Sequence, residues 1–141
     1  MAADADQGNG AVARRFFAAW MGGDPAALDA VVAPDYVFHD PADPATPPGP
    51  AGAKAMAAGF RAAFADLQLV EEDYVVGAER VAYRWRVRGT HRGAFAGVPP
   101  TGREVEFSGI EIVRLAGGRI VEHWDEIDAL GLLRQLGALP A

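Results

Sequence analysis

Hydrophobic and polar positions alternate most regularly over residues 104–128, where two strand-like runs flank a Gly-Gly turn. The two glycines supply the positive φ angles that a tight hairpin loop requires. A hairpin that closes with Leu115 opposite Arg119 places Glu111 opposite His123. The pattern therefore predicts two long antiparallel strands joined by a three-residue loop.

The two faces of this predicted hairpin differ in character. Because side chains alternate along a strand, every second residue of each run shares a face. One face collects Phe107, Glu111, Val113, Val121, His123 and Asp125. The other collects Ile110, Ile112, Ile120 and Trp124, with Glu122 and Glu126 between them. Apolar groups on a face that also carries two acids and a histidine indicate one wall of a partly polar cavity.

Helical periodicity dominates the first part of the chain. A helix is predicted from Gly10 to the pair Gly22-Gly23, and Asp24-Pro25 then begins a short second helix as N-cap and first-turn residue. A third helix is predicted over residues 52–64. The apolar positions of these helices are Val12, Phe16, Ala19 and Trp20, then Leu28, Val31 and Val32, then Met56, Phe60 and Phe64. Residues 1–9 are small and polar, which predicts a disordered tail.

The other predicted elements are mostly strands. They are a strand over 36–40, a proline-rich loop over 41–50, strands over 67–76 and 80–90, a connection over 91–102 and a helix over 129–136. In the strand over 80–90, Val81, Tyr83, Trp85 and Val87 alternate with a ladder of Arg84, Arg86 and Arg88, expected on a solvated face or in a subunit contact. Helices grouped before antiparallel strands predict a single α+β domain over residues 10–139, with the helices on one face of a curved sheet.

Composition narrows the function classes. The net charge of −6 argues against nucleic acid or an anionic membrane as partner. No apolar run approaches a membrane span, and the first residues lack the features of a signal peptide, so we expect a cytoplasmic location. The chain has no cysteine, which excludes disulfides and thiol chemistry. Its three histidines lack the spacing of metal ligands, so no metal is expected.

Glycine-containing motifs run through the second half of the chain. They are GTHRG at 89–93, GVPPTG at 97–102, GIEI at 109–112, GRIVEHWD at 118–125, LGLL at 130–133 and QLG at 135–137. Together with the first helix, FHDP at 38–41 and PPGP at 47–50, they resemble the SnoaL-like polyketide cyclase family, often labelled ester cyclases. The resemblance covers residues 11–139.

This resemblance implies a fold and an activity. The fold is the cone-shaped barrel of the NTF2-like, ketosteroid-isomerase type, with three N-terminal helices packed on a curved antiparallel sheet around a pocket. The activity is closure of the last ring of an anthracycline-type polyketide, by intramolecular aldol condensation of a methyl ester, as in antibiotic biosynthesis. The resemblance implies no metal and no organic cofactor, a small polyketide-like substrate, and a homo-oligomer, either a dimer or a tetramer.

The resemblance also implies site residues. Family cyclases use an aspartate on the last strand as general acid/base, supported by a residue on the preceding strand, and these positions match Asp125 and Glu111. The family's cyclases usually carry a histidine at the second position, so Glu111 departs from that pattern. A pocket histidine near the first strand matches His39.

Elementary chemistry supports a proton-transfer site on this face. Proton abstraction beside a carbonyl needs a base in a water-poor site and a donor aimed at the forming enolate oxygen. Two acids in one cavity should separate their pKa values, which leaves one as base and the other as donor. The substrate-binding residues expected around them are Phe16, Trp20, Phe60, Phe107 and His123.

Other interpretations stay open at this point. Asp125 can instead cap the closing helix or pair with an arginine, and each histidine can be structural. Trp85 and Trp124 fit a core position. The same pocket can serve isomerisation, dehydration, hydrolysis or cofactor-free oxygenation, or belong to a non-catalytic small-molecule-binding domain. Two buried carboxylates favour an enzyme, because burying charge costs several kcal/mol unless it is compensated.

Overall fold

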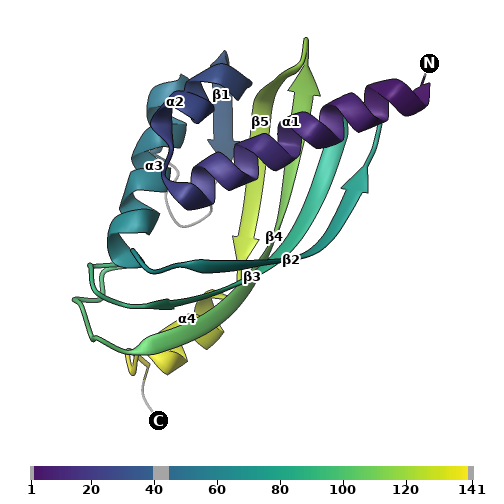
Figure 1. Cartoon of the computed structure of the whole chain (residues 1–141). Helices are drawn as coiled ribbons and strands as arrows, with labels where there is room; N and C mark the ends of the chain where they lie inside the picture. The colour runs from purple at the N-terminus through teal and green to yellow at the C-terminus, as the bar shows by residue number, and fades with distance from the viewer. Residues whose placement is uncertain (1, 40–44, 140–141) are drawn as a thin grey trace.

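A computed structural model describes residues 2–39 and 45–139 of the chain (Figure 1). The helices are α1 (Ala2–Gly22), α2 (Pro25–Val31), α3 (Gly49–Ala63) and α4 (Ala129–Gln135). The strands are β1 (Val32–His39), β2 (Gln68–Val76), β3 (Arg80–Thr90), β4 (Glu104–Ala116) and β5 (Arg119–Ile127). None of these helices combines the length and apolar composition needed to cross a membrane.

The five strands form one bent sheet in the order β1-β5-β4-β3-β2. Figure 1 shows α1 lying across one face of this sheet, with α2 and α3 beside it and α4 at the opposite end. The predicted α+β class is confirmed. However, β1 runs parallel to β5, so the sheet is mixed rather than wholly antiparallel. Because β1 and β2 are the two edges, the sheet is open rather than closed into a barrel.

Helix α1 begins at Ala2, well before the start predicted at Gly10, so the residues expected as a tail are helical from Ala2 onward. One tertiary contact lies just before the predicted start. Asn9 Nδ2 donates a 2.7 Å hydrogen bond to the carbonyl of Ala78 in the turn between β2 and β3. This anchor ties the first half of the helix to the sheet, which a local sequence pattern does not encode.

The boundary between α2 and β1 also differs from the prediction. Asp24 caps α2 as expected, with its carboxylate accepting from Ala27 N at 3.2 Å. The strand then begins at Val32, so the segment Pro34-Asp35 lies within β1 instead of stopping a helix. Proline is tolerated there because β1 is an edge strand. The predicted loop over 41–50 lies partly outside the described residues.

The β4–β5 hairpin has a different register from the one predicted. Its loop holds only Gly117 and Gly118, with φ angles of 60° and 75°, and a register shift between Arg114 and Leu115 leaves one extra residue on β5. As a consequence, Glu111 pairs directly with Asp125. The shift also turns Ile120 inward, where its side chain is fully buried.

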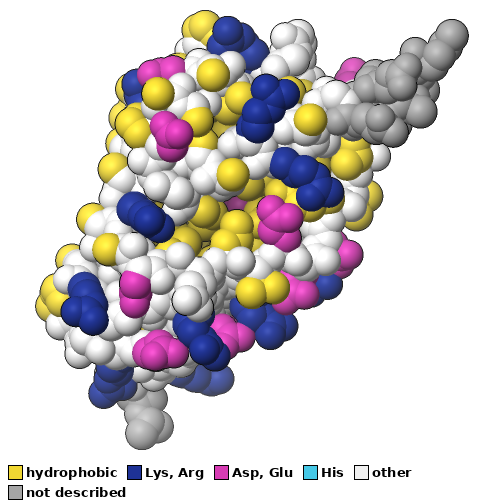
Figure 2. Space-filling view, viewed as in Figure 1, with side chains coloured by type: hydrophobic (Ala, Val, Ile, Leu, Met, Phe, Trp, Pro, Cys, Tyr) yellow, Lys and Arg dark blue, Asp and Glu magenta, His cyan; other side chains and the backbone are white. Residues whose placement is uncertain are grey.

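Strand β3 follows the prediction from end to end. Its apolar residues Val81, Tyr83, Trp85 and Val87 are buried. The arginine ladder is solvated, and its side chains form ion pairs with acids on β2 and β4: Arg84 with Asp73, Arg86 with Glu72 and Glu106, and Arg88 with Glu104 and Glu106. Figure 2 likewise shows basic and acidic side chains intermixed on one face of the molecule rather than gathered in a single-sign patch.

Candidate active site

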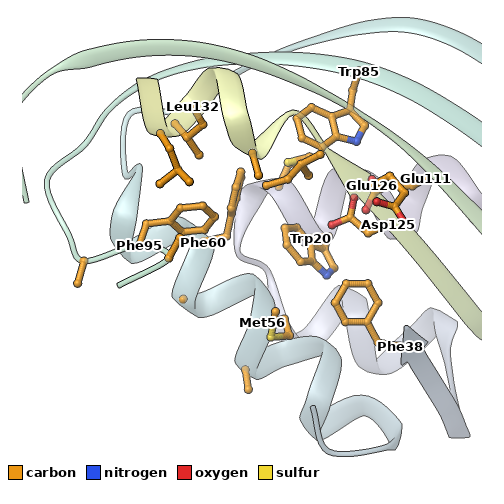
Figure 3. Close-up of a pocket in the computed structure, with 18 residues that line it drawn as sticks. Trp20, Phe38, Met56, Phe60, Trp85, Phe95, Glu111, Asp125, Glu126 and Leu132 are labelled. Atoms are coloured by element: carbon orange, nitrogen blue, oxygen red, sulfur yellow. The ribbon is translucent and has the colours of Figure 1, made fainter. Parts of the chain in front are cut away.

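A cavity of about 430 Å³ lies on the helix-covered face of the sheet. Its walls come from α1 (Trp20, Met21), β1 (Phe38), α3 (Ala55, Met56, Gly59, Phe60), β3 (Trp85), the 91–102 connection (Ala94, Phe95, Ala96), β4 (Glu111), β5 (Asp125, Glu126, Ile127) and α4 (Ala129, Leu132, Leu133). Figure 3 shows Phe60, Phe95 and Leu132 at one end and the carboxyl groups at the other. The cavity is therefore apolar along most of its length and polar at one end.

Glu111 and Asp125 form the polar end. They are direct cross-strand partners on β4 and β5, and such partners have Cβ atoms only about 4.5–5.5 Å apart. The Glu111 side chain is 2% exposed, whereas Asp125 is half-buried. Both point into the cavity between Trp20 and Trp85 (Figure 3). The structure thus brings the two predicted acids together more closely than the predicted register does.

Burial changes the acidity of Glu111. Loss of hydration raises its pKa from 4.5 to about 8, because removal from water penalises the charged form. The Trp85 indole N–H acts in the opposite direction and lowers this pKa, although it does not reach full hydrogen-bond geometry. Near neutral pH the Glu111 carboxyl therefore holds its proton and is available as a donor.

A buried chain of polar groups supports Glu111 from behind. Tyr36 Oη lies 2.9 Å from His123 Nδ1, and His123 Nε2 lies 2.8 Å from Glu111 Oε1. Burial and the nearby carboxyl groups raise the pKa of Tyr36 well above its ordinary value, so the phenol keeps its proton. When that phenol donates to Nδ1, a neutral imidazole carries its proton on Nε2 and donates it to Oε1. The Glu111 proton then belongs on Oε2.

The other predicted binding residues divide between the cavity wall and the layer behind it. Trp20 and Phe60 line the cavity. Phe16 instead packs edge-on against the His123 ring, with centroids 5.1 Å apart. Phe107 lies behind Phe60, with ring centroids 6.0 Å apart. His123, Phe16 and Phe107 therefore shape and support the site without forming its surface.

The structure does not bring His39 to the cavity. Phe38 pairs with His123 and His39 pairs with Trp124, so His39 lies on the outer face of the sheet. Its ring stacks on Trp124 at 5.2 Å, and its Nε2 lies 2.8 Å from Glu122 Oε2. The side chain is 44% exposed. The expected pocket position of His39 is thus corrected, and Phe38 takes that place.

The structure decides two of the alternatives left open by the sequence, namely helix capping by Asp125 and a structural role for His91. Asp128, not Asp125, caps α4, with its carboxylate accepting from Gly131 N at 2.9 Å. His91 is structural, because its Nδ1 accepts from Thr101 N at 3.2 Å across the base of the 91–102 connection. Among the described residues, no three His, Cys, Asp or Glu side chains gather into a candidate metal site.

Several residues of the candidate site escaped the sequence prediction. Trp85 was expected in the core, yet it is both buried and part of the cavity wall. Phe38 and Tyr36 had a usable signal, because they alternate on β1 and so share its inner face. Phe95 and Leu132 had no signal beyond being apolar, since the connection over 91–102 and α4 bring them to the cavity from separate parts of the chain.

Comparison with known proteins identifies this arrangement. A sequence profile of the SnoaL-like polyketide cyclase family matches residues 10–136. The chain belongs to the SnoaL-like polyketide cyclase family. This SnoaL-like chain is 30% identical over 116 residues to nogalonic acid methyl ester cyclase of Streptomyces nogalater, a match covering 78% of the chain and 83% of that relative. It is 33% identical over 90 residues to aklanonic acid methyl ester cyclase DnrD of Streptomyces peucetius, covering 63% of the chain and 62% of that relative.

Solved structures agree with the family assignment. TsrD from Streptomyces laurentii superposes on the SnoaL-like chain with a TM-score of 0.85 and 34% identity, over 94% of this chain and 97% of TsrD. IdmH from Streptomyces antibioticus gives a TM-score of 0.76 and 37% identity, over 92% of this chain and 98% of IdmH. The shared fold therefore extends over nearly the whole SnoaL-like chain.

Proposed function

We propose that this protein is a cofactor-independent cyclase that closes a ring by intramolecular aldol reaction of a polyketide-like ester. The observation that carries the proposal is the direct pairing of Asp125 with a buried, proton-holding Glu111 at the polar end of an apolar cavity. A carboxylate base beside a carboxylic acid donor is the pair of groups that enolate chemistry requires.

The proposed reaction begins at Asp125. Its carboxylate takes a proton from the carbon beside the ester carbonyl, and the resulting enolate attacks a ketone carbonyl of the same molecule. One carbon–carbon bond forms, and the attacked oxygen becomes an alkoxide. Glu111 protonates that alkoxide from Oε2, and the proton held by Asp125 then passes to its cross-strand neighbour Glu111. The reaction neither gains nor loses atoms, and both acids return to their starting states.

Tyr36 and His123 act as positioning residues in this scheme. The two hydrogen bonds, of 2.9 Å and 2.8 Å, hold the Glu111 carboxyl and occupy Oε1, which leaves Oε2 to carry the proton. Charge redistribution within such a buried network is less costly than reorganising water around an exposed acid. The same hydrogen bonds favour a single rotamer of Glu111 throughout the catalytic cycle.

The size and lining of the cavity support an aromatic substrate. Its volume of about 430 Å³ lies within the range of small-molecule sites. The relatives are named for aklanonic and nogalonic acid methyl esters. We infer a substrate of the same class, whose fused rings lie against Phe60, Phe95 and Leu132 while its ester reaches Asp125. A cytoplasmic homo-oligomer, dimer or tetramer, stays a prediction that light scattering on the purified chain can test.

The decisive experiment for this proposal is replacement of the base. We expect Asp125→Asn to lower kcat on aklanonic acid methyl ester by at least about 100-fold, because a positioned base contributes about 10² to 10⁴. Glu126→Gln is the matched control, since Glu126 is the neighbouring exposed acid in the same wall. Activity of Asp125→Asn close to that of the wild type would refute the assignment.

A second candidate is isomerisation of an unsaturated ketone. The observation that favours it is the protonated Glu111 beside Asp125, because ketosteroid isomerase also pairs a base with a neutral carboxylic acid donor. Incubation with 5-androstene-3,17-dione, followed by absorbance of the conjugated product, separates the two candidates. Turnover of this steroid without turnover of polyketide esters would favour isomerisation.

A further inference from the structure

Trp20 carries a buried hydrogen-bond donor that the fold does not use. Its side chain is 6% exposed and lines the cavity. Its Nε1 has no hydrogen-bond partner among the described residues. Buried polar groups are nearly always paired, and an unmade hydrogen bond costs free energy. A buried N–H in a cavity wall therefore points to a partner that arrives with the ligand.

The three tryptophans occupy three different environments. The Trp85 N–H faces Glu111 and so already interacts with the protein. Trp124 stacks on His39 at the outer face of the sheet. The indole Nε1 atoms of Trp20 and Trp85 are both buried without a hydrogen-bond partner among the described residues, but the Trp85 N–H faces Glu111, whereas no described acceptor is aimed at the Trp20 N–H. Trp124 consequently offers a matched control for any change made at Trp20.

The position of Trp20 is set by packing rather than by polar contacts. Its ring lies against Phe60 on α3, with centroids 5.3 Å apart and planes tilted by 51°. Figure 3 shows the indole at the polar end, near Asp125 and across from Trp85. A donor held in this way needs little reorganisation when charge develops on a nearby oxygen.

The chemistry of an indole distinguishes it from the acid donor. An indole N–H can donate a hydrogen bond but does not transfer its proton at ordinary pH. The aldol scheme has two oxygens with different needs. The enolate oxygen carries charge only briefly and then becomes a carbonyl again, whereas the alkoxide oxygen must finish as a hydroxyl. A fixed donor suits the first oxygen, and the Glu111 acid suits the second.

We propose that the Trp20 indole N–H donates a hydrogen bond to the ester carbonyl oxygen of the substrate and stabilises it as the enolate forms. This division of labour between Trp20 and Glu111 rests on the proposed cyclase function. Binding of a carbonyl group by Trp20 does not depend on the cyclase function. An experiment can therefore refute the carbonyl binding and the cyclase function separately. The site accordingly selects planar aromatic ketones and esters over hydrocarbons of the same shape.

The first test measures carbonyl recognition without turnover. Isothermal titration calorimetry with 1-tetralone and tetralin compares a C=O with a CH₂ in otherwise identical rings. Trp20→Phe removes the N–H but keeps an aromatic ring. We expect it to reduce the preference for the ketone by about 5- to 10-fold, the worth of one neutral hydrogen bond, while Trp124→Phe leaves it unchanged. An unaltered preference in Trp20→Phe overturns the proposal.

The second test measures the enolate step. With aklanonic acid methyl ester, we expect Trp20→Phe to lower kcat by about 10- to 100-fold with little change in KM, because bonds to charged groups are stronger than neutral ones. A rise in KM with unchanged kcat would assign Trp20 to packing alone. If Trp20→Phe does not fold, incorporation of β-(3-benzothienyl)alanine at this position removes the N–H and keeps the shape. If no variant turns over the ester, the calorimetric preference still decides the carbonyl claim.

Discussion

Stability should depend on pH through Glu111, and the size of this effect follows from its burial. The ordinary pKa is 4.5, and burial raises the folded-state pKa to about 8. Between these values the folded protein binds a proton at Glu111 that the unfolded chain has released. This contribution is fully present below pH 4.5 and is lost as the pH rises through 8. At about 1.4 kcal/mol per pH unit, about 5 kcal/mol is lost over the interval.

Glu111→Gln removes this titration without changing the shape of the side chain. Because glutamine cannot ionise, the free energy of unfolding of the variant should gain about 5 kcal/mol relative to the wild type between pH 4.5 and a pH above 8. Urea unfolding followed by circular dichroism at several pH values measures the difference. Glu126→Gln is the control, and its curve should run parallel to that of the wild type. Parallel curves for Glu111→Gln would refute the proton-holding state of Glu111.

Three further changes test other parts of the structure. Tyr36→Phe removes the buried hydrogen bond to His123 and should lower the unfolding free energy by about 1–2 kcal/mol, with a fall in kcat but not in KM. His39→Ala should leave kcat/KM within about twofold and stability within about 0.5 kcal/mol, because the side chain is exposed and lies away from the cavity. Gly109→Ala should lower stability by about 1–3 kcal/mol in thermal melts, because a Cβ there would lie 2.4 Å from a Trp85 ring carbon.

The local alternation of apolar and polar residues predicts much of the fold. The limits of β3 were predicted to the residue, because its buried apolar positions and exposed arginines alternate without a break. The same alternation placed His123 and Asp125 on one face of β5, and Glu111 joins that face because the predicted register was wrong by two residues, which leaves the face unchanged. The limits of β3 and the shared face of His123 and Asp125 are confirmed because they rest on neighbouring residues alone.

Register and strand partners lie beyond that local signal. The hairpin loop has two residues rather than three, and a bulge near Leu115 shifts the pairing further. Both features depend on how the strands fit the whole sheet. The correct register puts Asp125, and not His123, opposite Glu111, and the roles expected for the two acids are kept. His123 becomes a support behind the acid instead of its direct cross-strand partner.

For His39, the local strand pattern and the family resemblance gave different predictions. Alternation in β1 already separates it from Phe38, which lines the cavity. The family resemblance favoured a histidine near this strand, and the local pattern was the better guide. The remaining wall could not be predicted, because Phe95 and Leu132 reach the cavity from segments far apart in the sequence.

Proton exchange tests the central claim most directly. The wild type, Asp125→Asn and Glu111→Gln are each incubated with aklanonic acid methyl ester in D₂O, and NMR follows deuterium entry beside the ester together with ring closure. Asp125→Asn should show neither, whereas Glu111→Gln should still exchange the proton but close the ring slowly, because its alkoxide lacks a proton donor. Exchange in Asp125→Asn at the rate of the wild type would contradict the role of Asp125 as the base.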